Sequence, residues 1–148
     1  MSGSTYSFLD INAGIVGPGG AFPLANGAGP AEEGITITPT GPIGGMQIGA
    51  DGNGQHSLYA DHSGKVVVRL LKTSPVNAQL SQLYEFQVSS GAFYGQNTLT
   101  IQDVSRGDVI TCQQAAFAKA PDLHYSKEAG FNEWEFNALR ITRTLGNL

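Results

Sequence analysis

Cysteine, charge and long apolar runs are all scarce in this sequence. Of its 148 residues only Cys112 is a cysteine, so an internal disulfide is excluded and a reducing cytoplasm is compatible. No apolar run approaches the length of a membrane span. The first residues lack the basic and apolar regions of a signal peptide. We therefore expect a protein that is made in a cytoplasm and does not enter a membrane.

Charged residues make up 14% of the chain, whereas about a quarter is typical. The net charge is −4 and the Lys and Arg residues do not cluster, which argues against a protein that holds DNA through its phosphates. Glycine, in contrast, is abundant at 20 residues. A surface with little charge is typical of proteins that are covered by copies of themselves, so the composition predicts an oligomer.

The strongest local signals lie in residues 64–86. The first half, residues 65–71, is rich in β-branched and aliphatic side chains and predicts a core strand. Ser74 is a suitable helix cap, and Pro75 suits the first helical position because it lacks an N–H. A helix is therefore predicted over about residues 75–86, with an apolar stripe formed by Val76, Leu80, Leu83 and Tyr84.

This helix has a second, polar side. Its apolar stripe predicts that the helix closes an open side or end of a β structure. The opposite side could contact a partner or solvent, and it carries Asn77, Gln79, Ser81 and Gln82.

Most other segments alternate between apolar and polar residues and are separated by Gly or Pro turns, which predicts strands. Pro23 restricts its strand to a sheet edge. Leu139 and Ile141 break the alternation of the last strand, which predicts a bulge or bend near Ala138. The further strands are expected at residues 6–16, 21–24, 35–38, 55–60, 98–102, 109–117 and 132–141.

The fold class that follows is mainly β. About eight strands and one flanking helix predict a β-sandwich or barrel, formed as a single domain over residues 1–148. Two segments rich in glycine, at about residues 26–34 and 39–54, are expected to be loops. Ordered loops of such length usually have a function.

Several short motifs resemble metal sites, but each lacks part of the required set. Asp51-Gly52-Asn53-Gly54 imitates the start of a calcium loop, yet His62 occupies the place of the bidentate Glu, so a tight turn is predicted. His56 and Asp61 do not match recurrent zinc spacings, and His124 is remote in sequence. We expect neither a metal nor a cofactor.

No complete catalytic set is found either. Cys112 lies within a predicted strand and is expected to be a small core residue. Glu133 and Glu135 share one face of a strand, roughly 7 Å apart by strand rise, a separation that glycosidases use. A carbohydrate-active β-sandwich with these two acids therefore remains an alternative, although such alternation is equally typical of a solvated strand.

Five stretches together resemble the tail tube proteins of bacteriophages with contractile tails, in particular a short-chain group of phage structural proteins. They are residues 49–57 (Gly-Ala-Asp-Gly-Asn-Gly-Gln-His-Ser), 69–80 (Arg-Leu-Leu-Lys-Thr-Ser-Pro-Val-Asn-Ala-Gln-Leu), 107–113 (Gly-Asp-Val-Ile-Thr-Cys-Gln), Lys119-Ala120-Pro121 and 133–136 (Glu-Trp-Glu-Phe). The resemblance extends from Tyr6 to Ile141.

The resemblance implies a structural virion protein of the tail, made in the cytoplasm of a bacterial host and without enzymatic activity. Such proteins form hexameric rings that stack into a tube inside the sheath. Implied partners are copies of the chain itself, the sheath, baseplate and tail-terminator proteins, and the tape measure protein in the lumen before ejection. Genomic DNA then passes through the lumen without specific binding. A ring subunit of a related contractile injection or secretion machine is the alternative.

Two sets of residues are expected to serve this assembly. The glycine-rich segments would contact neighbouring subunits, through Gly41, Gly44, Gly45, Met46, Ile48, Asp51 and Asn53. A lumen with short polar and acidic side chains repels phosphates and offers them no cations. The candidates for the lumen wall are Glu133 and Glu135, or the face with Thr98, Thr100 and Gln102; the alternative is that these faces meet solvent or the sheath.

Overall fold

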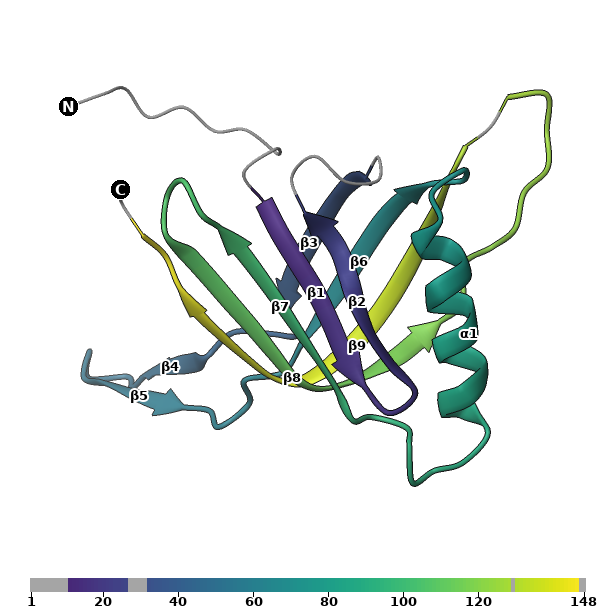
Figure 1. Ribbon diagram of the computed structural model, residues 1–148. Helices are drawn as coiled ribbons and strands as arrows, with labels where there is room; N and C mark the ends of the chain where they lie inside the picture. The colour runs from purple at the N-terminus through teal and green to yellow at the C-terminus, as the bar shows by residue number, and fades with distance from the viewer. Residues whose placement is uncertain (1–10, 27–31, 129, 147–148) are drawn as a thin grey trace.

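In the computed structural model, residues 11–26, 32–128 and 130–146 are described. Seven strands of this part form one sheet, two form a separate hairpin, and one helix follows the sixth strand (Figure 1). The start of the first predicted strand, residues 6–10, and the middle of the first glycine-rich segment, residues 27–31, lie outside the described residues. The sheet strands are β1 (Ile11–Gly17), β2 (Gly20–Asn26), β3 (Glu32–Pro39), β6 (Gly64–Leu71), β7 (Asn97–Asp103), β8 (Asp108–Lys119) and β9 (Phe131–Thr144).

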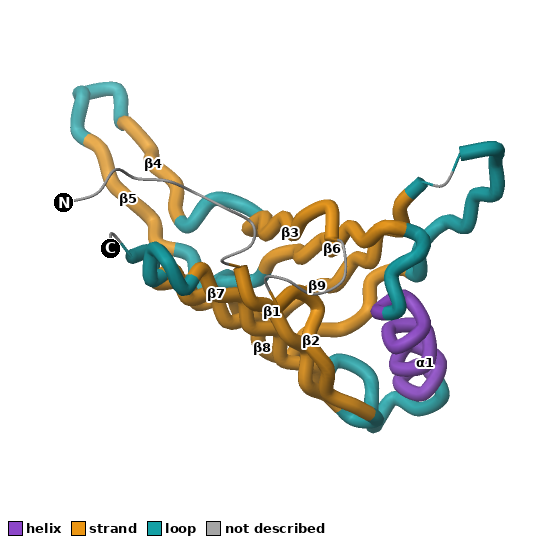
Figure 2. Tube along the Cα trace, turned by 45° about the horizontal axis from the view of Figure 1, so that its top comes forward, coloured by secondary structure: helices purple, strands orange, loops and turns teal. Residues whose placement is uncertain are grey.

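The sheet is antiparallel throughout, in the order β2-β1-β7-β8-β9-β6-β3. It curls so that β1, β2 and β7 form one layer and β3, β6 and the first half of β9 form the other (Figure 2). Because the edge strands β2 and β3 do not pair with each other, the fold is a sandwich and not a closed barrel. The prediction that Pro23 lies on an edge strand is confirmed.

The long strands β8 and β9 run through both layers, and both change phase where the sheet turns. In β8, Cys112 and Ala115 face the core, and the two residues between them are exposed. In β9, Ala138 and Ile141 face the core in the same way, and the two residues between them are exposed. Gln114 has a positive φ of 51°, and the register contains no pair between Gln114 and Leu139. The predicted break near Ala138 is thus confirmed as a bend without a register shift, a device by which strands pass from one sheet to another.

The core lies between the two layers. One layer contributes Ile15, Leu99 and Cys112, and the other contributes apolar side chains of β6 and β9, among them the fully buried Phe136. The helix α1 (Val76–Val88) adds the predicted stripe, because Val76, Leu80 and Leu83 are buried and Tyr84 packs edge-on against Phe117. The prediction that this helix covers the β structure is confirmed.

The helix begins at Val76, one residue after the predicted start, and ends at Val88, two residues later than expected. The Ser74 hydroxyl accepts a hydrogen bond from the N–H of Val76, and Pro75 already has helical dihedral angles. The placement of Asn77 on the outer side is wrong. Its side-chain oxygen accepts a hydrogen bond from the indole N–H of Trp134 at 3.0 Å, because a buried indole needs an acceptor. Gln79, Ser81 and Gln82 are exposed.

A buried pair of amides joins the end of α1 to the sheet. Gln87 and Asn97 exchange two hydrogen bonds of 2.7 Å, and Gln87 also donates to the carbonyl of Pro18. Both side chains are fully buried. A side chain at Gly17 would collide with Asn97, so this turn requires glycine. No local pattern in the sequence indicated this contact.

The prediction of a loop over residues 39–54 is wrong in the middle of that segment. Residues Gly44–Ile48 form β4 and pair with β5 (Gly54–Leu58) in an antiparallel hairpin that stands away from the sheet (Figures 1 and 2). The glycines of β4 hide its alternation, because Gly44, Met46 and Ile48 share one face. The other glycine-rich segment, residues 26–34, overlaps a strand at each end: it starts at the last residue of β2 and extends into the beginning of β3.

Candidate functional site

The hairpin formed by residues 44–58, called the arm below, has two unlike faces. The outward side chains of Met46, Ile48 and Leu58 lie on one face and are 63%, 60% and 84% exposed. The opposite face is polar, and on it the Gln55 amide donates a hydrogen bond to Gln47. The arm is therefore an amphipathic hairpin, and its apolar face, which also carries His56 opposite Met46, has no cover in the described chain.

The tip of the arm is an Asx turn, as the sequence predicts. Asp51 accepts hydrogen bonds from both the backbone N–H and the side-chain amide of Asn53. These bonds lower the pKa of the Asp51 carboxyl below its usual value. Gly52 has a positive φ of 86°, which glycine adopts without strain. The residues predicted to contact other subunits, except Gly41 in the preceding linker, thus lie on the arm.

A groove of about 390 Å³ lies at the base of the arm. Its apolar part comes from Pro39, Ile43 and Ile141, of which Ile43 is 51% exposed and Ile141 half-buried. Most of the other lining residues are polar. The residues of the groove come from the two linkers that flank the arm and from the end of β9. We call it the root groove; its lining residues are Pro39, Gly41, Ile43, Asp61, His62, Ser63, Ile141 and Arg143.

The two predicted lumen faces lie on opposite outer surfaces of the sandwich. Thr98, Thr100 and Gln102 point outward from β7, next to Gly14 on β1 and Thr111 on β8. On this face, called the neutral face, Arg140 is the one charged side chain among the described residues. Its other side chains are uncharged: hydroxyl and amide groups, together with the exposed Val16 and Val109.

Glu133 and Glu135 point outward from the other layer, where β9 pairs with β6. Glu133 forms an ion pair of 3.3 Å with Arg69, and Glu135 one of 3.7 Å with Lys65. Arg69 also lies over the ring of Phe131, 3.8 Å from its centre. This surface, called the paired face, therefore carries both signs of charge.

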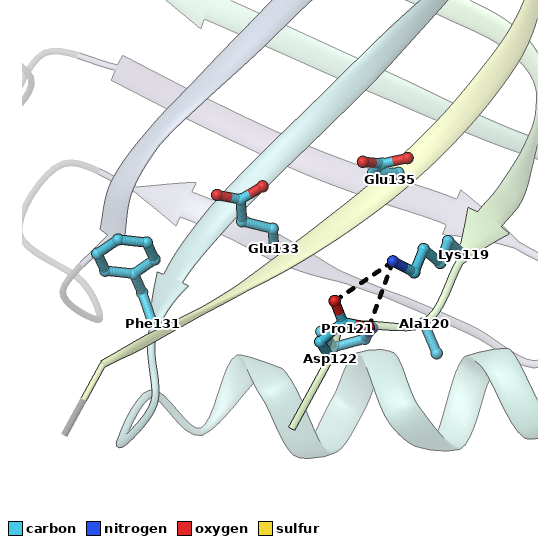
Figure 3. A pocket seen from close by; sticks show the side chains of 7 residues that line it. All are labelled: Lys119, Ala120, Pro121, Asp122, Phe131, Glu133 and Glu135. Atoms are coloured by element: carbon cyan, nitrogen blue, oxygen red, sulfur yellow. Dashed lines mark hydrogen bonds and ion pairs between the residues drawn. The ribbon is translucent and has the colours of Figure 1, made fainter. Parts of the chain in front are cut away.

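The same two carboxylates border a shallow pocket of about 260 Å³, with Lys119, Asp122 and Phe131 nearby (Figure 3). Each carboxylate already has a cation as its neighbour, and their side chains are 49% and 30% exposed. A glycosidase needs one carboxyl group held in an enclosed, apolar environment so that it keeps a proton. The open, ion-paired arrangement offers no support for that alternative.

The other candidate residues are dispersed. His56 lies on the arm, His62 in the root groove and His124 in the loop between β8 and β9. Within the described ranges no three His, Cys, Asp or Glu residues gather as a metal site would require. Cys112 is fully buried in the core, as predicted, and burial raises the pKa of its thiol to about 11. None of the described helices is long and apolar enough to cross a membrane.

The sequence matches the family described as bacteriophage PhiTE tail tube protein over residues 3–146. No curated protein matches it significantly. Among solved structures, the chain is similar to one in the cryo-EM structure of the anti-feeding prophage baseplate, six-fold symmetrised, with 15% identity, a TM-score of 0.61 and 97% of each chain covered.

Two further solved structures contain similar chains. In the anti-feeding prophage tube-terminating cap the identity is 11%, the TM-score 0.59, and the match covers 99% of this chain and 94% of that one. In the sheath–tube complex of the extracellular contractile injection system PVC, in its extended state, the identity is 10%, the TM-score 0.55, and the match covers 90% and 88%. At these identities the similarity establishes a common fold.

Proposed function

Since the chain belongs to the bacteriophage PhiTE tail tube protein family, we propose that it assembles into stacked hexameric rings that form the inner tube of a contractile tail. Its role is structural, in the tail of the virion. The family match carries this proposal, and it agrees with the resemblance read from the sequence. The six-fold symmetry and the sheath–tube context of the structurally similar proteins support the ring and the contractile tail.

The arm supports self-assembly most directly. An isolated two-stranded hairpin is at best marginally stable in water, and this one exposes three large apolar side chains. Contacts with neighbouring subunits would cover that face. In the assembled tail the expected partners are the sheath, the baseplate and the terminator, and similar chains occur in a sheath–tube complex and a cap.

In the assembled tube the neutral face lines the lumen, and DNA passes along it during ejection; the tape measure protein occupies the lumen beforehand. The two candidate faces point in opposite directions, so only one of them can face the axis. Lys65 and Arg69 on the paired face have side chains 50% and 40% exposed, and exposed cations bind phosphates. The neutral face, with Arg140 as its one charged side chain among the described residues, would hold DNA less.

A ring or tube subunit of a related injection machine is the runner-up, because the similar folds come from an anti-feeding prophage and an extracellular injection system. The presence of this chain in purified virions, measured by mass spectrometry, distinguishes a phage tail from such a machine.

The first test is electron microscopy of the purified protein. We expect rings of uniform diameter or long tubes, and cryo-EM of these should show Thr98, Thr100 and Gln102 facing the axis. A protein that stays monomeric at high concentration and after prolonged storage would contradict assembly. Tubes with Glu133 and Glu135 at the lumen would contradict only the choice of face.

A functional test places a lysine side chain on the proposed wall of the lumen. In a phage that carries Thr100→Lys, DNA ejection should slow several-fold at low salt and recover at high salt, because each added phosphate contact releases counterions. The matched control is Gln79→Lys on the exposed side of α1, which should eject DNA at the normal rate. Equal ejection rates in both variants would count against the neutral face as the lumen wall.

A further inference from the structure

The root groove and the arm are complementary parts of one chain. We infer that the arm of one copy binds in the root groove of the next copy, with its apolar face packed on Ile43 and Ile141. This inference rests on the proposed function, because it requires copies of the chain to assemble. It adds the surface that receives the arm and the residues that form the contact.

The arm needs a partner for physical reasons. Met46, Ile48 and Leu58 lie on one face of a hairpin that projects away from the body of the subunit (Figure 2). Apolar surface that is removed from water stabilises a contact. A hairpin with this face uncovered has little to offset the entropy lost on ordering it. The face is therefore suited to be buried against another surface.

The root groove offers such a surface. It has a volume of about 390 Å³ and lies open at the base of the arm. Ile43 and Ile141 supply an apolar centre, and Asp61, His62 and Arg143 supply polar groups around it. An apolar centre with a polar rim is the usual composition of a protein–protein contact.

The occupant must come from another copy. None of Met46, Ile48 and Leu58 lines the groove of its own chain. The arm extends away from the sheet (Figure 2). A contact between two different surfaces of identical chains is heterologous, and when it does not close it propagates along an axis. An arm in every groove would thus link ring to ring.

Charge agrees with this pairing. Arg143 in the groove has no ion-pair partner among the described residues. The Asp61 carboxylate beside it already accepts hydrogen bonds from the backbone N–H and hydroxyl of Ser63. The tip of the arm carries the carboxylate of Asp51, only three residues beyond Ile48. Arg143 therefore offers the Asp51 carboxylate a charge of opposite sign, within a groove that also contains the carboxylate of Asp61.

Photo-crosslinking tests the inference on assembled wild-type tubes doped with a variant. The photoreactive residue p-benzoylphenylalanine replaces Met46 in one variant and Gln47, on the opposite face of the arm, in the matched control. After irradiation we expect a covalent dimer from the first variant, whose crosslinked peptide contains residues 39–43, 61–63 or 141–143. The control should give at least five-fold less of this product.

Crosslinks that map to another region, or that are equal in both variants, would overturn the groove assignment while the tubes themselves uphold the proposed function. If a bulky residue at position 46 is excluded from the tubes, the double variant Met46→Cys/Arg143→Cys replaces it. Oxidation should then produce a ladder of linked chains, and a ladder absent from assembled tubes would equally overturn the inference. If the wild-type protein forms no tubes at all, the proposed function fails instead.

Discussion

The body of the subunit and its arm differ in how much of their side-chain surface is buried. The body, formed by the curled sheet and α1, buries whole side chains such as Phe136, Leu80 and Val66 with no exposed surface. The arm buries none, and every residue of β5 is exposed. The body therefore has its own hydrophobic core, whereas the arm has none. In the proposed assembly a neighbouring subunit would cover the arm, so that folding and assembly would depend on different parts of the chain.

The largest effect should come from charging the contact between α1 and the body. Leu80→Asp combined with Leu83→Asp places two carboxylates in the core, where an unpaired charge costs several kcal/mol. We expect the variant to lose its folded state, measured by circular dichroism and soluble yield. The control Gln82→Ala changes an exposed residue of the same helix and should fold normally. If the two variants behave alike, the assigned side of the helix is wrong.

A smaller effect is expected from the buried amide pair that joins α1 to β7. Gln87→Ala leaves the amide of Asn97 buried without its partner, which should destabilise the body by about 2 kcal/mol. For a chain of this size that corresponds to a fall in Tm of about 4–8 °C. Gln79→Ala on the exposed side of the helix is the control. An unchanged Tm for Gln87→Ala would mean that water satisfies the orphaned amide.

The smallest effect on the stability of the subunit is expected from Ile48→Asp. The same variant should nevertheless prevent the assembly of tubes. The residue is exposed in the subunit, so the free energy of unfolding should change by less than about 0.5 kcal/mol. Tubes, counted by electron microscopy and sedimentation, should nevertheless be lost, because a charge would enter the buried contact of the arm. Gln47→Asp, on the polar face, is the matched control and should assemble. A large drop in Tm for Ile48→Asp would show that the arm belongs to the body's core.

Local patterns predicted the elements of the body well. The stripe of α1 and the break near Ala138 depend on neighbours within a few residues, and the structure confirms them. The family, too, could be inferred from the sequence, and the match over residues 3–146 confirms it.

Long-range contacts were the source of the errors. The alternation that gives the arm its apolar face is obscured by glycines, so only the pairing of β4 with β5 made it visible. Asn77 is a polar residue of a kind usually found in contact with solvent. Its side chain nevertheless lies inward, because it accepts a hydrogen bond from Trp134, which is far away in the sequence. The cations that accompany Glu133 and Glu135 come from β6, and no spacing within β9 indicates them.

The sequence by itself determined the apolar stripe of the helix and the alternation of the strands in the body, because both follow from the period of the backbone. Tertiary structure alone decided which strands are neighbours, that the two candidate lumen faces lie back to back, and that the linkers of the arm meet the end of β9 in the root groove. These features join residues that are up to about a hundred positions apart, and such contacts exist only once the sheet has curled around its core.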